Sequence, residues 1–154
     1  MIFKRIRVAV VAAAAIAFTI TTSACSLFGA SRDDNGTLTD AATIHINDTE
    51  VGDCLVDFLE SGDSIDKVKA VPCTMAHDSE VFAKTANALA SSESWAGDYC
   101  LGKFAEYIGI EIDESILDFY FVYPQANSTD RTVVCIVFEP GVTDSTDSLK
   151  GVAR

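Results

Sequence analysis

The segment TVVCIVF at residues 132–138 is apolar on both faces of an extended chain. This pattern is typical of an interior strand of a sheet that is covered on both sides. Just upstream, LDFYFVY at residues 117–123 places four large apolar side chains on one face, and the run stops at Pro124. Residues 127–130 (NSTD) between the two segments are typical of a turn, so an antiparallel hairpin with a longish loop is predicted.

One helix is predicted before this hairpin. Over residues 92–108 large apolar side chains recur at spacings of three to five, and Gly109 ends the pattern. Weaker patterns predict short strands at residues 43–46, 66–71 and 80–89, and a turn that enters a short extended or single-turn segment at residues 51–55. The fold class expected from these elements is α+β, a small antiparallel sheet with one main helix packed on it.

Residues 1–24 have the features of an export signal. Three basic residues among the first seven precede an uncharged run of 13 residues at positions 8–20, and small residues follow before Cys25. Thirteen helical residues span roughly 20 Å, which is too short to cross a hydrocarbon layer ~30 Å thick. The segment is therefore expected to be a lipoprotein-type signal peptide that is removed on export.

Cys25 directly follows Thr21-Thr22-Ser23-Ala24 and resembles the acylated cysteine of bacterial lipoproteins. Thr22 stands where that motif usually has Leu, so an ordinary signal peptidase that releases a soluble secreted protein is the alternative. The chain has five cysteines, an odd number for an exported protein, and lipidation of Cys25 leaves an even four. We expect acyl chains such as palmitate on Cys25 to hold the protein on the outer face of the cytoplasmic membrane.

Residues 25–42 are expected to be a flexible tether. They are rich in Gly, Ser, Thr, Asp and Asn and show no apolar periodicity. A flexible chain of this length has a root-mean-square reach of roughly 20–25 Å. Residues 43–154 have the length of one folded domain.

The charge of the mature chain excludes two classes of partner. Removal of residues 1–24 leaves eight Lys and Arg against 23 Asp and Glu, a formal net charge of −15. Nucleic-acid binding depends on neutralised phosphates, and adsorption to anionic lipid depends on basic residues. Neither is expected here, so contact with a membrane must come from the acyl chains.

Six short motifs follow one another between residues 50 and 151. In this order, and with their four cysteines, they resemble the septum-formation domain family, small exported or membrane-attached domains of actinobacteria. The resemblance implies a place in the cell envelope and a link with septum formation or cell division, and it implies no known reaction. A Trp that often precedes a Gly-Asp-Arg turn in the family has no counterpart in residues 127–131. The motifs are Gly52-Asp53-Cys54, Val71-Pro72-Cys73, His77-Asp78-Ser79-Glu80-Val81, Cys100, Asp130-Arg131-Thr132-Val133-Val134-Cys135 and Ser148-Leu149-Lys150-Gly151.

The four cysteines of the domain allow three disulfide pairings. We favour Cys54–Cys73, which closes a loop around the Gly-Asp-Cys turn, and Cys100–Cys135, which fixes the main helix to the interior strand. An exported location makes the oxidised state the default. A four-cysteine metal site is the rival, but the close Cys-x-x-Cys pairs that zinc sites favour are absent from the sequence.

The segment from Cys73 to Glu80 brings a thiol, an imidazole and two carboxylates within eight residues. A nucleophilic Cys73–His77 pair needs a free thiolate, which conflicts with a disulfide at Cys73. A divalent metal held by His77, Asp78, Glu80 and His45 is a second interpretation, since imidazole and carboxylate are suitable ligands. The third is structural: His77 and Asp78 hydrogen-bond the backbone of a loop that the Cys73 bridge fixes. A contact with a partner protein completes the alternatives.

Arg131, at the start of the apolar strand, is interpreted as half of a structural ion pair, with a neighbour of Asp130 or with Glu80, and ligand binding is the alternative. The sequence contains no Gly-rich phosphate loop, Gly-x-Ser-x-Gly turn or His-Glu-x-x-His motif. We therefore expect a non-enzymatic envelope lipoprotein without a cofactor or resident metal, which acts as a module for binding an envelope protein. The alternative is a small metal- or ligand-binding lipoprotein that uses His77, Asp78, Glu80 and Arg131.

Overall fold

The computed structural model describes residues 29–58, 65–86, 92–125 and 128–154. The expected signal peptide at residues 1–24, the lipidation site Cys25 and the end of the strand expected over residues 80–89 lie outside these ranges. The elements along the chain are β1 (Ala42–His45), the 3₁₀ helix η1 (Ile46–Asp48), β2 (Cys54–Val56), β3 (Lys67–Val71), β4 (Ser79–Thr85), α1 (Glu93–Ile108), the 3₁₀ helix η2 (Ile112–Glu114), β5 (Asp118–Val122) and β6 (Val133–Phe138).

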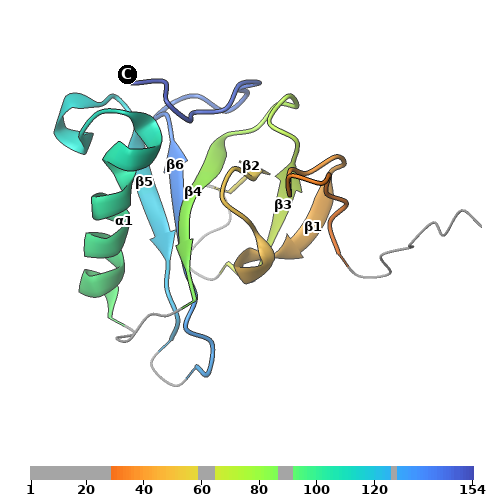
Figure 1. Ribbon diagram of the computed structural model, residues 1–154, viewed down its shortest axis with the longest axis horizontal. Helices are drawn as coiled ribbons and strands as arrows, with labels where there is room; N and C mark the ends of the chain where they lie inside the picture. Colours follow the sequence, from red (N-terminus) through yellow and green to blue (C-terminus); the bar gives the residue numbers. More distant parts are fainter. Residues whose placement is uncertain (1–28, 59–64, 87–91, 126–127) are drawn as a thin grey trace, which may run out of the picture.

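The six described strands form one antiparallel sheet in the order β1-β3-β2-β4-β6-β5, and α1 packs on one face of it (Figure 1). The α+β fold class expected from the sequence is thus confirmed. The predicted hairpin is β5 and β6, which pair directly. Strand β6 lies between β4 and β5, and its residues 133–137 are all buried, as its two-sided apolar pattern predicts.

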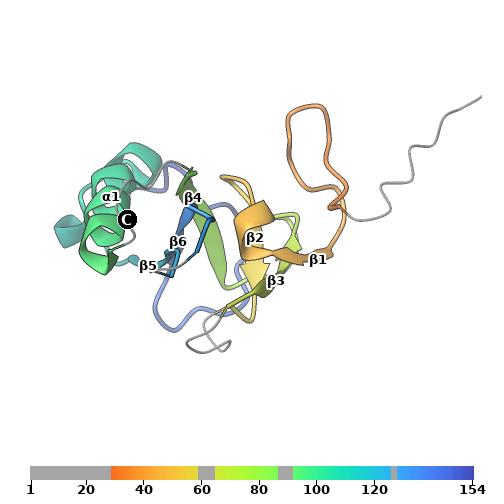
Figure 2. The same ribbon diagram turned by 90° about the horizontal axis from the view of Figure 1, so that it is seen from below.

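The sheet has a separate apolar core on each face. On β6, Val133, Cys135 and Val137 face the core beneath α1, whereas Val134 and Ile136 face the core on the other side. This second core also takes in apolar side chains of β1, β2 and β3. Strands at opposite ends of the sheet can share one core only if the sheet is strongly coiled, so that β1, β3 and β2 curl toward the concave side of β4, β6 and β5 (Figure 2).

The helix α1 owes its position to one buried stripe. Ala96, Cys100, Phe104 and Ile108 recur every four residues and are fully buried against the sheet. The Ser92 side chain accepts a hydrogen bond from the Trp95 N–H at the helix start, and Gly109 takes a left-handed conformation at its end. Neither α1 nor any other helix of the described residues has the length and apolar character needed to cross a membrane.

The expectation of a flexible tether over residues 25–42 is wrong for its described part, residues 29–42, which is folded against the domain. Residues 32 and 38 form a β-bridge around a turn, and Leu38 is buried in the core of the concave side. Arg32 forms an ion pair with Asp53 at 2.7 Å. One leucine and one arginine make no periodic pattern, so the composition of this segment gave no sign of these contacts.

Candidate functional site

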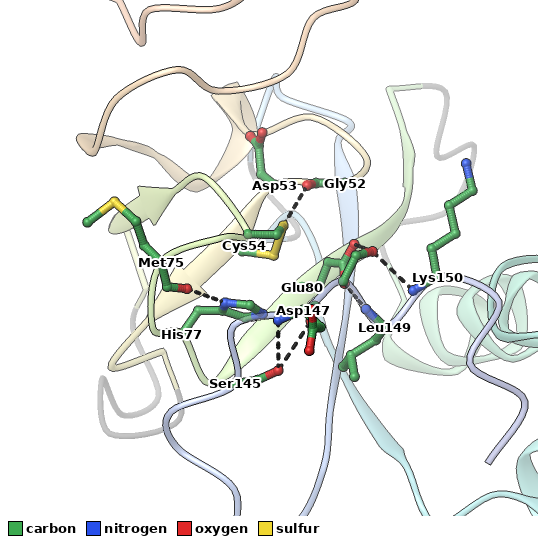
Figure 3. Close-up of a disulfide and its surroundings, with 12 residues drawn as sticks. Gly52, Asp53, Cys54, Met75, His77, Glu80, Ser145, Asp147, Leu149 and Lys150 are labelled. Atoms are coloured by element: carbon green, nitrogen blue, oxygen red, sulfur yellow. Dashed lines mark hydrogen bonds between the residues drawn. A yellow bond between two sulfur atoms is a disulfide. The ribbon is translucent and has the colours of Figure 1, made fainter.

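Both disulfide pairings favoured from the sequence are confirmed by sulfur atoms within bonding distance. Cys54 opens β2 and Cys73 follows β3, with 5.2 Å between their Cα atoms. Cys100 on α1 reaches Cys135 on β6, with 5.6 Å between their Cα atoms. The second bridge lies wholly inside the core beneath the helix, whereas the first is surrounded by polar groups (Figure 3).

The buried carboxylate of Glu80 is the centre of those polar groups. Its Oε1 accepts hydrogen bonds from the Tyr107 hydroxyl at 2.6 Å and the Ser148 hydroxyl at 2.7 Å, and its Oε2 accepts one from the Leu149 N–H at 2.5 Å. These donors come from α1 and from the C-terminal segment, so a side chain of β4 joins three parts of the fold. Glu80 is only 1% exposed, and the three hydrogen bonds offset the cost of its burial.

Tyr107 is held as a hydrogen-bond donor. Burial raises its pKa far above the usual range, and the hydrogen bond to Glu80 raises the pKa further. The hydroxyl therefore stays protonated toward the carboxylate. The Nζ of Lys150 lies 5.8 Å from the centre of the Tyr107 ring, a cation–π distance.

A second buried carboxylate, Asp53, lies in the Gly-Asp-Cys turn. It receives both arms of the Arg32 guanidinium at 2.7 Å and the Glu50 N–H at 2.8 Å. The hydrogen bond from Arg32 to Asp53 is also the main reason why the pKa of Arg32 is raised. The neighbouring Gly52 has a φ of 94°, which favours glycine, and its N–H reaches the Val81 carbonyl at 2.8 Å. The turn is therefore fixed to both β4 and the N-terminal segment.

His77 fixes a loop, in agreement with the structural interpretation. Its Nδ1 lies 2.8 Å from the Met75 carbonyl oxygen, and its backbone exchanges two hydrogen bonds of 2.9 Å with Ser145. The side chain is 1% exposed, and its Nε2 has no hydrogen-bond partner among the described residues. Figure 3 shows His77 beside the Cys54–Cys73 bridge, with Met75 and Ser145 on either side.

Asp78 is used within the same loop. Its carboxylate accepts hydrogen bonds from the Phe58 N–H at 3.1 Å and the Ser79 hydroxyl at 2.7 Å, and partial burial raises its pKa. The side chains of His77, Asp78 and Glu80 thus have three different sets of hydrogen-bond partners. The fold does not assemble them into one metal site.

The remaining expected metal ligand, His45, lies elsewhere. Its Nε2 is 2.9 Å from Asp66, and its Nδ1 accepts the Asn47 N–H. Among the described residues, the one group of three potential ligands within metal-binding distance is Cys54, Cys73 and Glu80. Its two sulfur atoms are joined to each other in the disulfide, so they are not available as thiolates.

The expected Arg131–Glu80 ion pair is wrong. Arg131 is exposed, and no ion pair joins it to a described carboxylate. Glu80 is occupied by Tyr107, Ser148 and Leu149 instead. The physical reason is that Glu80 points into the core beneath α1, whereas Arg131 precedes β6 in a loop at the surface.

Sequence reasoning missed Arg32, Asp53 and Tyr107 as partners in these buried contacts. The Arg32–Asp53 pair is separated by 21 residues, and the Tyr107–Glu80 pair by 27. The one available signal was the position of Asp53 and Glu80 inside the short motifs, next to cysteines or apolar residues. Comparisons of the chain with protein-family models, with curated proteins and with solved structures gave no match.

Proposed function

We propose that this chain is a non-enzymatic lipoprotein of the cell envelope whose domain binds another envelope protein, in a role linked to septum formation or cell division. The location follows from the export signal and from Cys25. The link with septum formation follows from the resemblance of the motifs. The domain supports the non-enzymatic part of the proposal, because its potentially reactive side chains are engaged in contacts that stabilise the fold.

The observation that carries the non-enzymatic proposal is the occupation of Glu80. A general acid or base must present its carboxyl group to a substrate, but both Glu80 oxygens are engaged by internal donors. A nucleophilic cysteine must be a thiolate, but Cys73 is bonded to Cys54. The side chains that looked most reactive in the sequence therefore hold the domain together.

Four of the six motifs of the resemblance meet near one bridge. Cys54 and Cys73 form it, Glu80 lies close to both sulfur atoms, and Ser148 and Leu149 donate to Glu80, although these residues span about a hundred positions of sequence (Figure 3). Each contributes a turn, a sulfur or a hydrogen bond to the same place. This supports the interpretation of the motifs as requirements of a fold.

The folded N-terminal segment also shortens the proposed tether. Three residues separate Cys25 from Gly29, where the described chain begins, and the four Cα-to-Cα steps between them reach at most roughly 14 Å. In Figures 1 and 2 this segment lies beside β1, at the opposite side of the domain from α1. An acyl anchor on Cys25 would therefore hold the β1 side near the membrane and direct α1 and β5 away from it.

Anchoring is tested with the full chain and its Cys25→Ser variant, expressed in an actinobacterial host. The wild-type chain is expected in the membrane fraction, to incorporate an alkyne-labelled palmitate, and to have an intact mass that starts at residue 25. The variant is expected in the soluble exported fraction. A variant that stays membrane-bound, or a wild-type chain that keeps Met1, would refute the lipoprotein proposal.

The role in septum formation needs a separate measurement. A fluorescent fusion of the full chain is expected to concentrate at division sites, and its Cys25→Ser variant is expected to lose that pattern. Uniform fluorescence around the envelope in dividing cells would remove the link with septum formation. It would leave the anchoring result intact.

The metal-binding alternative is tested by thermal unfolding of the mature chain in zinc, in calcium and in a chelator. Since His77, Asp78 and Glu80 face separate partners, the unfolding midpoint is expected to be the same in all three conditions. A midpoint that rises with a metal and loses this response in His77→Ala would favour the alternative.

A further inference from the structure

A cleft separates the two outer strands of the coiled sheet. It has a volume of about 420 Å³ and is bounded on one side by β5 with the segment that follows it, residues 120–125. The other side is formed by residues 45–47 and 65–66. The Asn47 side chain donates a hydrogen bond to Asp130 at 2.5 Å and so links the two sides of the cleft. We name this feature the edge cleft.

Strand β5 has one edge that faces no other described strand, and on it the Phe119 N–H donates to Asp118 Oδ1 at 2.8 Å. Strand β5 is last in the order of the sheet and pairs only with β6 among the described strands. In an antiparallel pair, alternate N–H and C=O groups of an outer strand point away from its partner. Natural proteins often protect such an edge with Lys or Pro, and β5 (DFYFV) contains neither. It can therefore pair with one more extended chain.

Aromatic side chains give this edge a firm apolar surface. Tyr120 is 44% exposed, and its ring lies 5.8 Å from the Phe58 ring and 6.3 Å from the Phe121 ring. Ile116, two residues before β5, is 59% exposed. Tyrosine with a supported ring is a common anchor of protein interfaces, because it buries much area and loses little conformational entropy.

The charge of the residues around the edge cleft indicates which kind of segment can bind there. The described residues that line it include Asp66 and Asp130 and no Lys or Arg. The Asp66 side chain is 80% exposed, and Asn47 and Thr132 hold the pKa of Asp130 below its usual value, chiefly through hydrogen bonds from Thr132. Arg131, between two lining residues, does not line the cleft itself. A basic segment is therefore favoured over an acidic one.

A second copy of the chain fits this surface less well. Each mature chain carries a formal charge of −15, so two copies repel each other as they approach. Exposed Asp113, Glu114 and Asp118 lie just before β5 and at its first residue, where a second copy of β5 would bring its own carboxylates.

We propose that β5 binds an extended, Lys- or Arg-containing segment of an envelope protein as a seventh strand in the edge cleft. Backbone hydrogen bonds to β5 hold the segment, alternate side chains contact Tyr120, and its basic side chains meet Asp66 and Asp130. The proposal rests on the proposed function, since it names the surface and partner class of the interaction module.

The test uses the full mature chain with Cys25→Ser and a fluorescein-labelled octapeptide in which Lys alternates with Val. Fluorescence anisotropy is expected to show saturable binding that weakens as salt rises. A peptide with Glu in place of Lys is expected to bind at least tenfold more weakly. Two further Lys-Val peptides carry methyl groups on the odd or on the even backbone nitrogens, and one of these two is expected to lose binding.

Matched substitutions locate the binding site. Tyr120→Ser is expected to weaken binding about tenfold, as for an interface anchor, whereas Leu101→Ser on α1 should leave it unchanged. Tyr120 and Leu101 are both 44% exposed, so the comparison controls for the loss of a surface apolar side chain. Asp66→Lys is expected to weaken binding more than Asp98→Lys, which reverses an exposed charge on α1.

Three results would overturn the proposal. They are equal binding of the Lys and Glu peptides, equal effects of Tyr120→Ser and Leu101→Ser, and full binding of both methylated peptides. A dimer in light scattering that Tyr120→Ser dissociates would assign the edge to a second copy instead. Failure of peptide binding leaves the anchoring result untouched, and a failure of anchoring leaves peptide binding to be observed, so the two proposals fail separately.

Discussion

The two disulfides of this domain lie in regions that are stabilised in different ways. Cys100–Cys135 is enclosed by apolar side chains between α1 and the sheet, where the Phe82 ring meets the rings of Phe104 and Phe119 at 5.9 and 6.0 Å. Cys54–Cys73 lies close to the buried carboxylate of Glu80, and Asp53, a second buried acid, directly precedes Cys54. Both acids accept hydrogen bonds from specific donors: Arg32 and Glu50 for Asp53, and residues 107, 148 and 149 for Glu80.

The difference shows what each region tolerates. Apolar packing is non-directional, so the helix side should accept conservative apolar substitutions at modest cost. Buried polar groups lose much more when one partner is removed, because the other is left without a hydrogen bond. The polar region around Cys54–Cys73 should therefore be sensitive to the loss of a single donor or acceptor atom.

The largest loss of stability is expected when a disulfide is removed. Removal of Cys100–Cys135 by the double change to Ala should lower the free energy of unfolding by about 4 kcal/mol, against about 3 kcal/mol for Cys54–Cys73. The first spans 35 residues and the second 19, and a longer loop gains more entropy when it is opened. Cys100 and Cys135 are also both fully buried and would leave a cavity.

Urea unfolding of both double variants measures these values. If the Cys54–Cys73 variant lost more stability than the Cys100–Cys135 variant, the polar region would depend on its disulfide more than loop length implies. The comparison between an apolar and a polar region would then need revision.

Glu80 is expected to give the next largest effect. Glu80→Ala should lower the free energy of unfolding by about 3 kcal/mol, because the donors on Tyr107, Ser148 and Leu149 lose their acceptor. Glu80→Gln should cost less, about 1–2 kcal/mol, because the amide oxygen still accepts from two of them. Glu106→Gln, on the exposed face of α1, is the control and should change nothing measurable.

Near-equal unfolding curves for Glu80→Ala and the wild-type chain would contradict the role assigned to this carboxylate. Near-ultraviolet circular dichroism of the same samples reports whether Tyr107 remains packed. A native spectrum in Glu80→Ala would show that apolar packing alone orders the C-terminal segment.

The ion pair of Arg32 and Asp53 is expected to contribute about 1 kcal/mol, because it is partly exposed to solvent. The substitution Arg32→Gln should have a clearer local effect, because it releases the N-terminal segment from Asp53. Amide hydrogen exchange of residues 33–39 is the measurement. Their backbone hydrogen bonds, such as Thr39 N–H to the Ser31 carbonyl at 3.0 Å, should exchange faster.

Arg32→Lys separates charge from geometry in this pair. A lysine keeps the charge but not the two-armed contact, so exchange in this variant should be intermediate. Unchanged exchange in Arg32→Gln would mean that Leu38 alone holds the segment, and that the polar region does not extend to the N-terminal side.

The smallest effect is expected in the alkaline range. Because the folded state raises the pKa of Tyr107, it binds this proton more tightly than the unfolded chain does. The stabilisation is complete below the unfolded pKa of about 10 and is lost as the pH rises above it. The free energy of unfolding should therefore fall between pH 10 and 11, and fall less steeply in Tyr107→Phe. Equal slopes in the two proteins would contradict this linkage.

The sequence by itself determined the elements whose signals are local. The two-sided apolar run of residues 132–138 predicted an interior strand, and the large apolar side chains that recur over residues 92–108 predicted the helix, because periodicity depends only on neighbours along the chain. The disulfide pairing followed from an even number of cysteines together with the expected placement of these elements. The structural use of His77 was one of several interpretations that the sequence left open.

Tertiary structure alone decided the contacts between distant segments. No periodicity announces that Arg32 will meet Asp53, or that Glu80 will receive donors from residues 107, 148 and 149. The coiling of the sheet likewise depends on how both of its faces bury their apolar side chains, and it is this coiling that leaves the edge cleft beside β5. Such contacts depend on distance in space, which local patterns do not encode.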